Sequence, residues 1–568
     1  MAHQGYTMPP PSLGLDLVSP IDNMDPASAL ELTNIFPGAG APTVRGGYTQ
    51  FADLSSVVGG SSAPVRMMAE MPLRDGTRQL IAAQDTKLFS INSAGAITNI
   101  TGAAGPYASG RWNYTLFSNI AGTNNYIYLA NAYGDAPQVY LGSGVAQTIN
   151  ATCRSGPAIT ELSNVFLYRF RLYFIQRNSL TMWYDKTVGA TGGATMTGTS
   201  STLDSYDFSG IMRRGGSLLF LGNYTNQNGI NPQDYFVAIT TEGEIAVYSG
   251  SSPDANTGSD VWSLVAHFQI GRPLGPKAFV RVNQDFWIIT QQGIVPMSAL
   301  FQTDPEQALN IVSRPINPLI TQYASQVTLS EMWTGFFWGF GRRVYVTLPD
   351  SAGSATLLVY SIDTKAWTQF VLYSGDHCVS SCRYDFNPYY GSNTGLIFKG
   401  EDGTRDAVLA NGTSQAITFT CRTAFSFYGS RGNYKAFKDI RPLIKTKRGV
   451  QLTLGLDTDF KRMPVLASVS TSTANYTKWG STGGTPTFTQ WGSNGNAYTP
   501  YKYPGDTPVT ITVPQYTQPW SSDVEYIYDR HAVSGQGTSA AIRMAGSIIN
   551  TTLQIIGFEV RYDLGGQV

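Results

Sequence analysis

The alternation of apolar and polar residues between positions 343 and 372 predicts three short strands. Val344 and Val346 share one face of an extended segment, as in a half-buried strand. A turn rich in Pro, Asp, Ser and Gly follows, and residues 357–361 form a second apolar stretch. After a tight turn, residues 367–371 run back as a third strand. Such an antiparallel meander is typical of one blade of a β-propeller.

Other stretches repeat this order of strand, turn and strand at irregular spacing. They cover residues 79–100, 126–149, 166–184, 235–265, 279–297 and 396–409. A single sheet of this kind leaves an apolar face uncovered, and radial stacking of several sheets covers these faces. We therefore predict a β-propeller over residues 55–413, preceded by an N-terminal arm and first strands at 1–54.

The pattern changes near residue 414, where the predicted strands become longer. A segment rich in Thr, Ser, Gly, Trp and Tyr interrupts them at 465–535. Long strands on either side of such an insertion favour a β-sandwich, so we predict a separate platform domain over residues 414–568. Helical patterns are short, and the best candidates are residues 25–32 and 304–325.

The composition agrees with an all-β chain and narrows the classes of function. Charged residues make up 13% of the chain, and Gly contributes 59 residues, a balance typical of chains with many turns. The formal net charge is +0, which argues against a protein that holds nucleic acid by its overall charge. Four cysteines do not make a disulfide scaffold in a chain of this length. We find no secretory signal and expect no membrane-spanning segment.

Several short motifs, spread along most of the chain, resemble one known family. They are Asn34, Phe36, Pro37, Arg45, Gly46, Gly47 and Tyr48 near the N-terminus, the segments 359–370, 423–443 and 554–562, and the dipeptides at Trp479 and Trp491, each followed by Gly. In this order they resemble the tail nozzle, or tail hub, proteins of short-tailed bacteriophages, which include tail tubular protein B and packaged-DNA stabilisation proteins. The sequence departs from that family at Ile35, where Trp is common.

The resemblance implies a structural virion protein that forms the ring-shaped nozzle, or distal tube, of a short phage tail. Such a ring, a homohexamer by the resemblance, would retain packaged DNA and provide the channel for its ejection. The implied partners are further copies of the chain, the head-to-tail adaptor protein, tail fibres or other tail proteins, and viral double-stranded DNA that passes without sequence specificity. The implied location is the virion tail, after assembly in the host cytoplasm. On this reading the protein is not an enzyme, and no cofactor, metal or catalytic residue is expected.

Two other interpretations stay open at this point. The first is a receptor- or glycan-binding tail protein built on a β-propeller, which would use surface aromatic residues on the propeller loops. The second is a propeller hydrolase, but the acidic residues Asp363, Glu401 and Asp402 are better explained as turn caps than as a catalytic pair.

One cluster and one run of residues could carry chemistry. The cluster is His377, Cys378, Cys382 and Cys421, which lacks a second close pair of ligands and so favours buried thiols over a zinc site. The basic run is Arg431, Lys435, Lys438, Arg441, Lys445, Lys447 and Arg448. These side chains are candidates for a face that meets the adaptor or DNA phosphates, and the competing interpretation is a solvated strand. Pro442 favours a strand end or a sheet edge, so we expect Lys435 and Lys438 near the rim, where a change of both to Glu would leave the monomer folded.

Overall fold

The computed structural model describes residues 4–567, except for 58–59, 119–124, 187–200, 227–232, 256–260, 302–310, 328–332, 351–352, 373–376, 447–449, 463–508, 513–524 and 528–529. Strands account for 54% of the structure and helices for 6%, which confirms the all-β prediction. Within the described ranges, none of the helices has the length and apolar character needed to cross a bilayer. Most of the predicted insertion at 465–535, with Trp479 and Trp491, lies outside the described residues.

The chain forms two compact units. The propeller unit consists of Thr49–Val359 and Ser374–Glu401, and the platform unit of Met1–Tyr48, Tyr360–Tyr373 and Asp402–Val568. This division differs from the sequence-based one, because the N-terminal arm and the segment around residue 367 both belong to the platform unit. The physical reason is strand pairing over long range, since β30 (Trp367–Val371) pairs with strands of the N-terminal arm.

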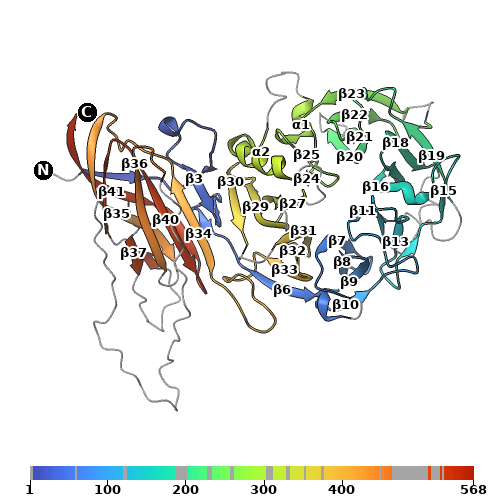
Figure 1. The fold of residues 1–568 in the computed structure, drawn as a ribbon, viewed down its shortest axis with the longest axis horizontal. Helices are drawn as coiled ribbons and strands as arrows, with labels where there is room; N and C mark the ends of the chain where they lie inside the picture. Colours follow the sequence, from blue (N-terminus) through green and yellow to red (C-terminus); the bar gives the residue numbers. More distant parts are fainter. Residues whose placement is uncertain are drawn as a thin grey trace, which may run out of the picture. The chain divides into compact units, whose positions relative to one another are not determined.

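The propeller unit is a series of antiparallel sheets (Figure 1). The first sheets contain β7 (Val65–Pro72), β8 (Arg78–Gln84), β9 (Lys87–Ile91) and β10 (Ile97–Asn99); β11 (Asn113–Ser118), β12 (Asn125–Ala130), β13 (Gln138–Tyr140) and β14 (Gln147–Thr148); and β15 (Ala151–Cys153), β16 (Leu162–Tyr168), β17 (Arg171–Gln176), β18 (Thr181–Asp185) and β19 (Ser201–Asp207). The following strands are β20 (Leu218–Asn226), β21 (Gln233–Thr240), β22 (Glu244–Ser249) and β23 (Ser263–Gln269); β24 (Phe279–Val282), β25 (Asp285–Thr290) and β26 (Gly293–Pro296); β27 (Gly335–Trp338), β28 (Arg343–Asp350) and β29 (Gly353–Ser361); and β31 (Cys378–Tyr384), β32 (Asn387–Ser392) and β33 (Leu396–Gly400). Helices α1 (Met297–Leu300) and α2 (Asn317–Gln326) lie between β26 and β27 in the chain.

The sheets close into a ring around a common axis. Neighbouring sheets contact one another through their inner strands: β11 contacts β7 and β16, β16 contacts β20, β27 contacts β24 and β31, and β31 contacts β7. Apolar clusters fill the space between neighbouring sheets, and one of them joins β7–β9 to β31–β33. Strand β6 (Tyr48–Asp53) pairs with β33, so the two ends of the unit meet in one sheet. This arrangement confirms the β-propeller prediction.

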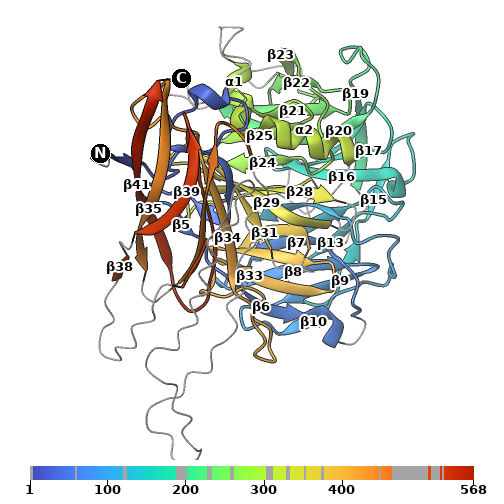
Figure 2. The ribbon, with the colours of Figure 1, turned by 60° about the vertical axis from the view of Figure 1, so that its left-hand side comes forward.

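The platform unit is built from two sheets. One contains β1 (Gln4–Met8), β4 (Ile35–Phe36), β5 (Thr43–Val44), β35 (Asn433–Thr446), β38 (Glu525–Ile527), β39 (His531–Gly537) and β41 (Leu553–Gln567). The other contains β2 (Gly14–Leu15), β3 (Ser28–Thr33), β30 (Trp367–Val371), β34 (Ile417–Thr423), β36 (Gln451–Thr458), β37 (Val509–Thr512) and β40 (Ala540–Ile548). The long strands β35 and β41 run side by side (Figure 2).

The two platform sheets pack face to face, as the sandwich prediction requires. Thr423 on β34 contacts Met8 on β1, with 3.9 Å between the hydroxyl and the thioether sulfur. The buried rings of Tyr428, Phe437 and Tyr562 pack together between the sheets. All nine residues of β40 are buried, so this strand is covered on both of its faces.

The helix predicted at residues 25–32 is wrong, because β3 occupies Ser28–Thr33. Asp25 does not cap a helix; its carboxylate accepts the amide of Ala27 at 2.8 Å and forms a local turn. Pairing with β34 then draws the following residues into a strand. The second predicted helix corresponds to α2, which begins at Asn317, and residues 302–310 lie outside the described ranges.

Candidate functional site

The N-terminal motif residues Asn34 and Arg45 meet Asp406 inside the platform unit. The Nη1 and Nη2 atoms of Arg45 donate to the two carboxylate oxygens of Asp406, at 2.7 and 2.6 Å. Arg45 Nε donates to Asn34 Oδ1 at 2.8 Å. Both side chains of the ion pair are 3% exposed. Such a pair persists in the interior because each charge is compensated by the other and by further hydrogen bonds.

The side chain of Asn34 connects three segments that are far apart in sequence. Its Nδ2 atom donates to the carbonyl oxygens of Val371 and Thr418, at 3.1 and 2.7 Å. Its Oδ1 atom accepts the amide of Val371 at 2.8 Å. The backbone of Asn34 has φ 59, a left-handed conformation that Asn tolerates better than most residues. Sequence analysis singled out Asn34 and Arg45 but missed Asp406, since nothing in the local pattern marks that residue.

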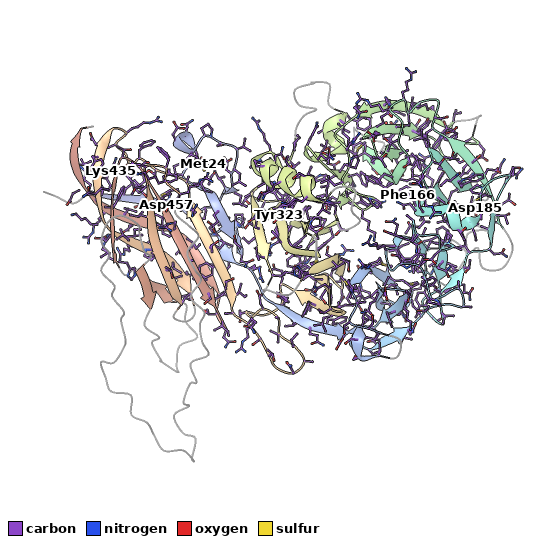
Figure 3. All side chains as sticks on the ribbon, in the orientation of Figure 1. Met24, Phe166, Asp185, Tyr323, Lys435 and Asp457 are labelled. Atoms are coloured by element: carbon purple, nitrogen blue, oxygen red, sulfur yellow. The ribbon has the colours of Figure 1, made fainter. Side chains whose placement is uncertain are left out.

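Lys435, the central residue of the predicted basic site, is buried (Figure 3). Its Nζ atom donates to the carbonyl oxygens of Ser430, Asn433 and Thr538, at 2.5, 3.0 and 2.9 Å. Desolvation lowers the pKa of its ammonium group. The expectation that Lys435 lies on a solvated rim is therefore corrected: the side chain ties the start of β35 to the turn before β40.

The other basic side chains face acids on neighbouring strands or loops. Ion pairs join Arg431 to Asp22 at 3.1 Å, Lys438 to Asp563 at 3.5 Å, and Arg441 to Glu559 at 3.3 Å. Lys445 lies on β35 and is partly buried, and Lys447 and Arg448 lie outside the described residues. The surface around β35 is thus nearly balanced in charge, and its role towards an adaptor or DNA stays a prediction.

The cysteines have the environment of buried thiols. Cys378, Cys382 and Cys421 are buried, and desolvation raises the pKa of all three, for Cys378 to about 12. Such thiols are protonated near neutral pH and are poor metal ligands in that form. Among the described residues, no group of three or more His, Cys, Asp or Glu side chains is arranged to hold a metal ion.

A polar group that sequence analysis did not identify lies on the inner strands of the propeller unit. It consists of Glu70 on β7, Tyr114 on β11, Arg281 on β24 and Arg383 on β31. Glu70 accepts hydrogen bonds from Arg78 and, at 3.5 Å, from Arg383. Tyr114 is 41% exposed although its strand is an inner one, so solvent reaches this side of the ring. Desolvation by the surrounding protein nevertheless raises the pKa of its phenol.

Arg281 differs from the other arginines of this group because no described carboxylate lies within ion-pairing distance of it. Its guanidinium stacks over the ring of Phe166, with 5.4 Å to the ring centre. Figure 3 marks the position of Phe166 in the propeller unit. Desolvation lowers its pKa, while the charges of Tyr114 and Asp234 act in the opposite direction. These residues are scattered over four sheets, and their sequence spacing carries no signal; only closure of the ring brings them together.

The comparisons with known proteins bear on the fold. No family model and no curated protein matches the chain. Similar solved structures include a catalytically inactive virginiamycin B lyase from Staphylococcus aureus with quinupristin, at 10% identity over 61% of this chain and 96% of that one, with a TM-score of 0.38. A streptogramin B lyase structure matches at 11% identity, over 62% and 96%, with a TM-score of 0.37. YCF48 from Cyanidioschyzon merolae matches at 11% identity, over 60% and 96%, with a TM-score of 0.36.

These matches correct one expectation. The prediction that the protein is not an enzyme is withdrawn, because two of the similar structures are lyases. At identities of 10% and 11% the likeness concerns the propeller fold and assigns no activity or substrate to this chain.

Proposed function

We propose that the protein is a virion component that forms the ring-shaped nozzle of a short phage tail, where it retains packaged DNA and provides the channel for its ejection. The observation that carries this proposal is that the motif segments behind the family resemblance meet in the platform unit. Asn34 of the N-terminal motif donates its backbone amide to the carbonyl oxygen of Gln369, in the motif at 359–370, with 2.7 Å between the two atoms.

The same unit unites the remaining motif segments through strand pairing. Strand β3 pairs with β34 in antiparallel orientation and with β30 in parallel orientation. Strands β35 and β41, which contain the two C-terminal motifs, pair over most of their lengths. Motifs that meet in space support a common structural origin better than motifs that merely follow one another in sequence.

In the proposed ring, the platform units of several copies, a homohexamer by the resemblance, would surround the channel below the head-to-tail adaptor. Tail fibres or other tail proteins would attach around this ring. A net charge of +0 suits a tube through which DNA must slide, because each phosphate contact would add salt-dependent affinity. Assembly in the host cytoplasm would then deliver the protein to the virion tail.

Imaging of labelled virions tests the proposal. A peptide tag at the C-terminus, made visible with a tag-specific antibody fragment, should mark the distal end of the tail with six-fold symmetry. Native mass measurement of detached tails should give a ring of this chain. Absence of the chain from purified virions, or a label on the head, would contradict the proposal.

A second candidate is a receptor- or glycan-binding tail protein, and one observation favours it. Three phenylalanines in hairpin turns that join the inner strand of a sheet to the next strand are strongly exposed: Phe340 by 84%, Phe386 by 56% and Phe170 by 52%. Large apolar rings at loop tips are typical of contact surfaces. Binding of the purified protein to host cells, lost in a triple change of these residues to Ser, would favour this candidate over the nozzle.

A further inference from the structure

Arg281 and Tyr114 are two exposed side chains on inner strands, and their polar atoms form no hydrogen bond with any residue that the structure describes. The ring of Phe166 supports the guanidinium of Arg281 but supplies no hydrogen-bond acceptor. Phe166 lies on β16, and β11, which carries Tyr114, contacts β16, so the two side chains lie over neighbouring inner strands. The charge of each acts on the other. Both groups are hydrogen-bond donors that face the inner side of the propeller ring.

The acids in this region already have other partners. Glu70 is held by Arg78 and Arg383. Asp234 accepts hydrogen bonds from the side chains of Asn223 and Thr225, at 3.3 and 3.1 Å. Neither carboxylate therefore neutralises Arg281 at short range, and its guanidinium stays charged at every physiological pH.

We propose that Arg281 and Tyr114 form an anion-binding site at the propeller axis, which takes the carboxylate or phosphate group of a small ligand. Carboxylate and phosphate oxygens only accept hydrogen bonds, and they match the planar array of donors on a guanidinium. The phenol of Tyr114 adds a neutral donor, since its proton is retained near neutral pH. Arg383, whose side chain is 49% exposed, adds a second positive charge whose field reaches Tyr114.

The surrounding protein strengthens such a contact. Desolvation acts on both Arg281 and Tyr114, and a charge pair in a partly dehydrated place interacts more strongly than the same pair in bulk water. Exposed ion pairs elsewhere on the molecule lack this advantage. The site should therefore bind anions with a preference that surface arginines do not show.

Isothermal titration calorimetry on the full chain at low ionic strength tests the proposal, with inorganic phosphate and glucuronate as probes. The wild type should bind at least one probe at a single saturable site. Arg281→Gln should weaken that binding about tenfold or more, because it removes charged hydrogen bonds. Tyr114→Phe should weaken it less. Phosphate binding alone assigns a phosphate group, and glucuronate binding alone assigns a carboxylate.

Arg272→Gln is the matched control. Arg272 belongs to the same unit, its side chain is 60% exposed, and it pairs with Glu242 at 2.7 Å. Its replacement should leave probe binding unchanged. The proposal is overturned if the wild type binds neither probe, or if Arg272→Gln and Arg281→Gln weaken binding equally. If Arg281→Gln does not fold, an unchanged affinity in Tyr114→Phe overturns it.

Discussion

At the scale of single residues, the contacts of Asp406 and Lys435 show how the platform unit compensates buried charge. Asp406 faces one guanidinium with both of its oxygens, and Lys435 faces three carbonyl oxygens with its ammonium group. Neither charge reaches water, so each depends on its partners. Two substitutions test this dependence.

Asp406→Ala should destabilise the platform unit by about 3–5 kcal/mol, because it leaves the buried Arg45 guanidinium without its counter-charge. Denaturant unfolding followed by tryptophan fluorescence measures this loss. The control is Asp22→Ala, which breaks the exposed pair with Arg431 and should cost at most about 1 kcal/mol. Equal effects of the two changes would show that burial of the Arg45 pair does not matter.

Lys435→Met should destabilise the same unit by about 1–3 kcal/mol, because three carbonyl oxygens lose their donor. The lowered pKa of Lys435 adds a pH dependence, because the ammonium group holds its proton more firmly in the unfolded chain than in the folded one. The free energy of unfolding of the wild type should therefore rise as the pH increases towards the pKa of the unfolded chain, about 10.4. This rise should shrink in Lys435→Met. Lys438→Met changes an exposed partner of Asp563 and should leave both quantities nearly unchanged.

At the scale of elements, the outer strands of the propeller unit differ in how they avoid edge pairing. Strands β10 and β14 have three and two residues, and β19 is covered by β15. Strand β23 is an edge strand, since β22 is its only partner among the described strands. It has seven residues, and none of them carries a formal charge. Leu264 and Val265 on it are 45% and 44% exposed. Uncharged exposed edges of this length favour association between chains.

Val265→Lys should therefore reduce self-association of the purified protein, because a charge on an edge strand opposes pairing with another strand. Light scattering at increasing protein concentration measures the effect. Gln269→Lys, at the polar end of the same strand, is the control and should change association less. If neither variant differs from the wild type, β23 is not the edge at which copies meet.

At the scale of the whole molecule, each unit has its own core. In the propeller unit, Trp112 is fully buried between sheets, whereas the core of the platform unit includes Phe425 and Leu30. We expect two calorimetric transitions. Trp112→Ala should lower one of them, by about 3–5 kcal/mol of unfolding free energy, and Asp406→Ala should lower the other. If calorimetry shows a single transition, and Trp112→Ala and Asp406→Ala lower its temperature equally, the two units unfold together.

The sequence by itself determined the all-β class, the blade meanders and the position of most strands, because alternation and turn residues act over a few positions. Strands β28 and β29 follow the pattern read at 343–372; the third predicted strand, β30, lies at its expected residues but belongs to the platform unit and not to a blade. Only the tertiary structure decided that Ser28–Thr33 is a strand, that Arg45 pairs with Asp406 and that Lys435 is buried. It also brought Tyr114 and Arg281 to one side of the ring. These outcomes depend on contacts between segments hundreds of residues apart. The free energy of such contacts comes from packing and desolvation, which the local sequence pattern does not indicate.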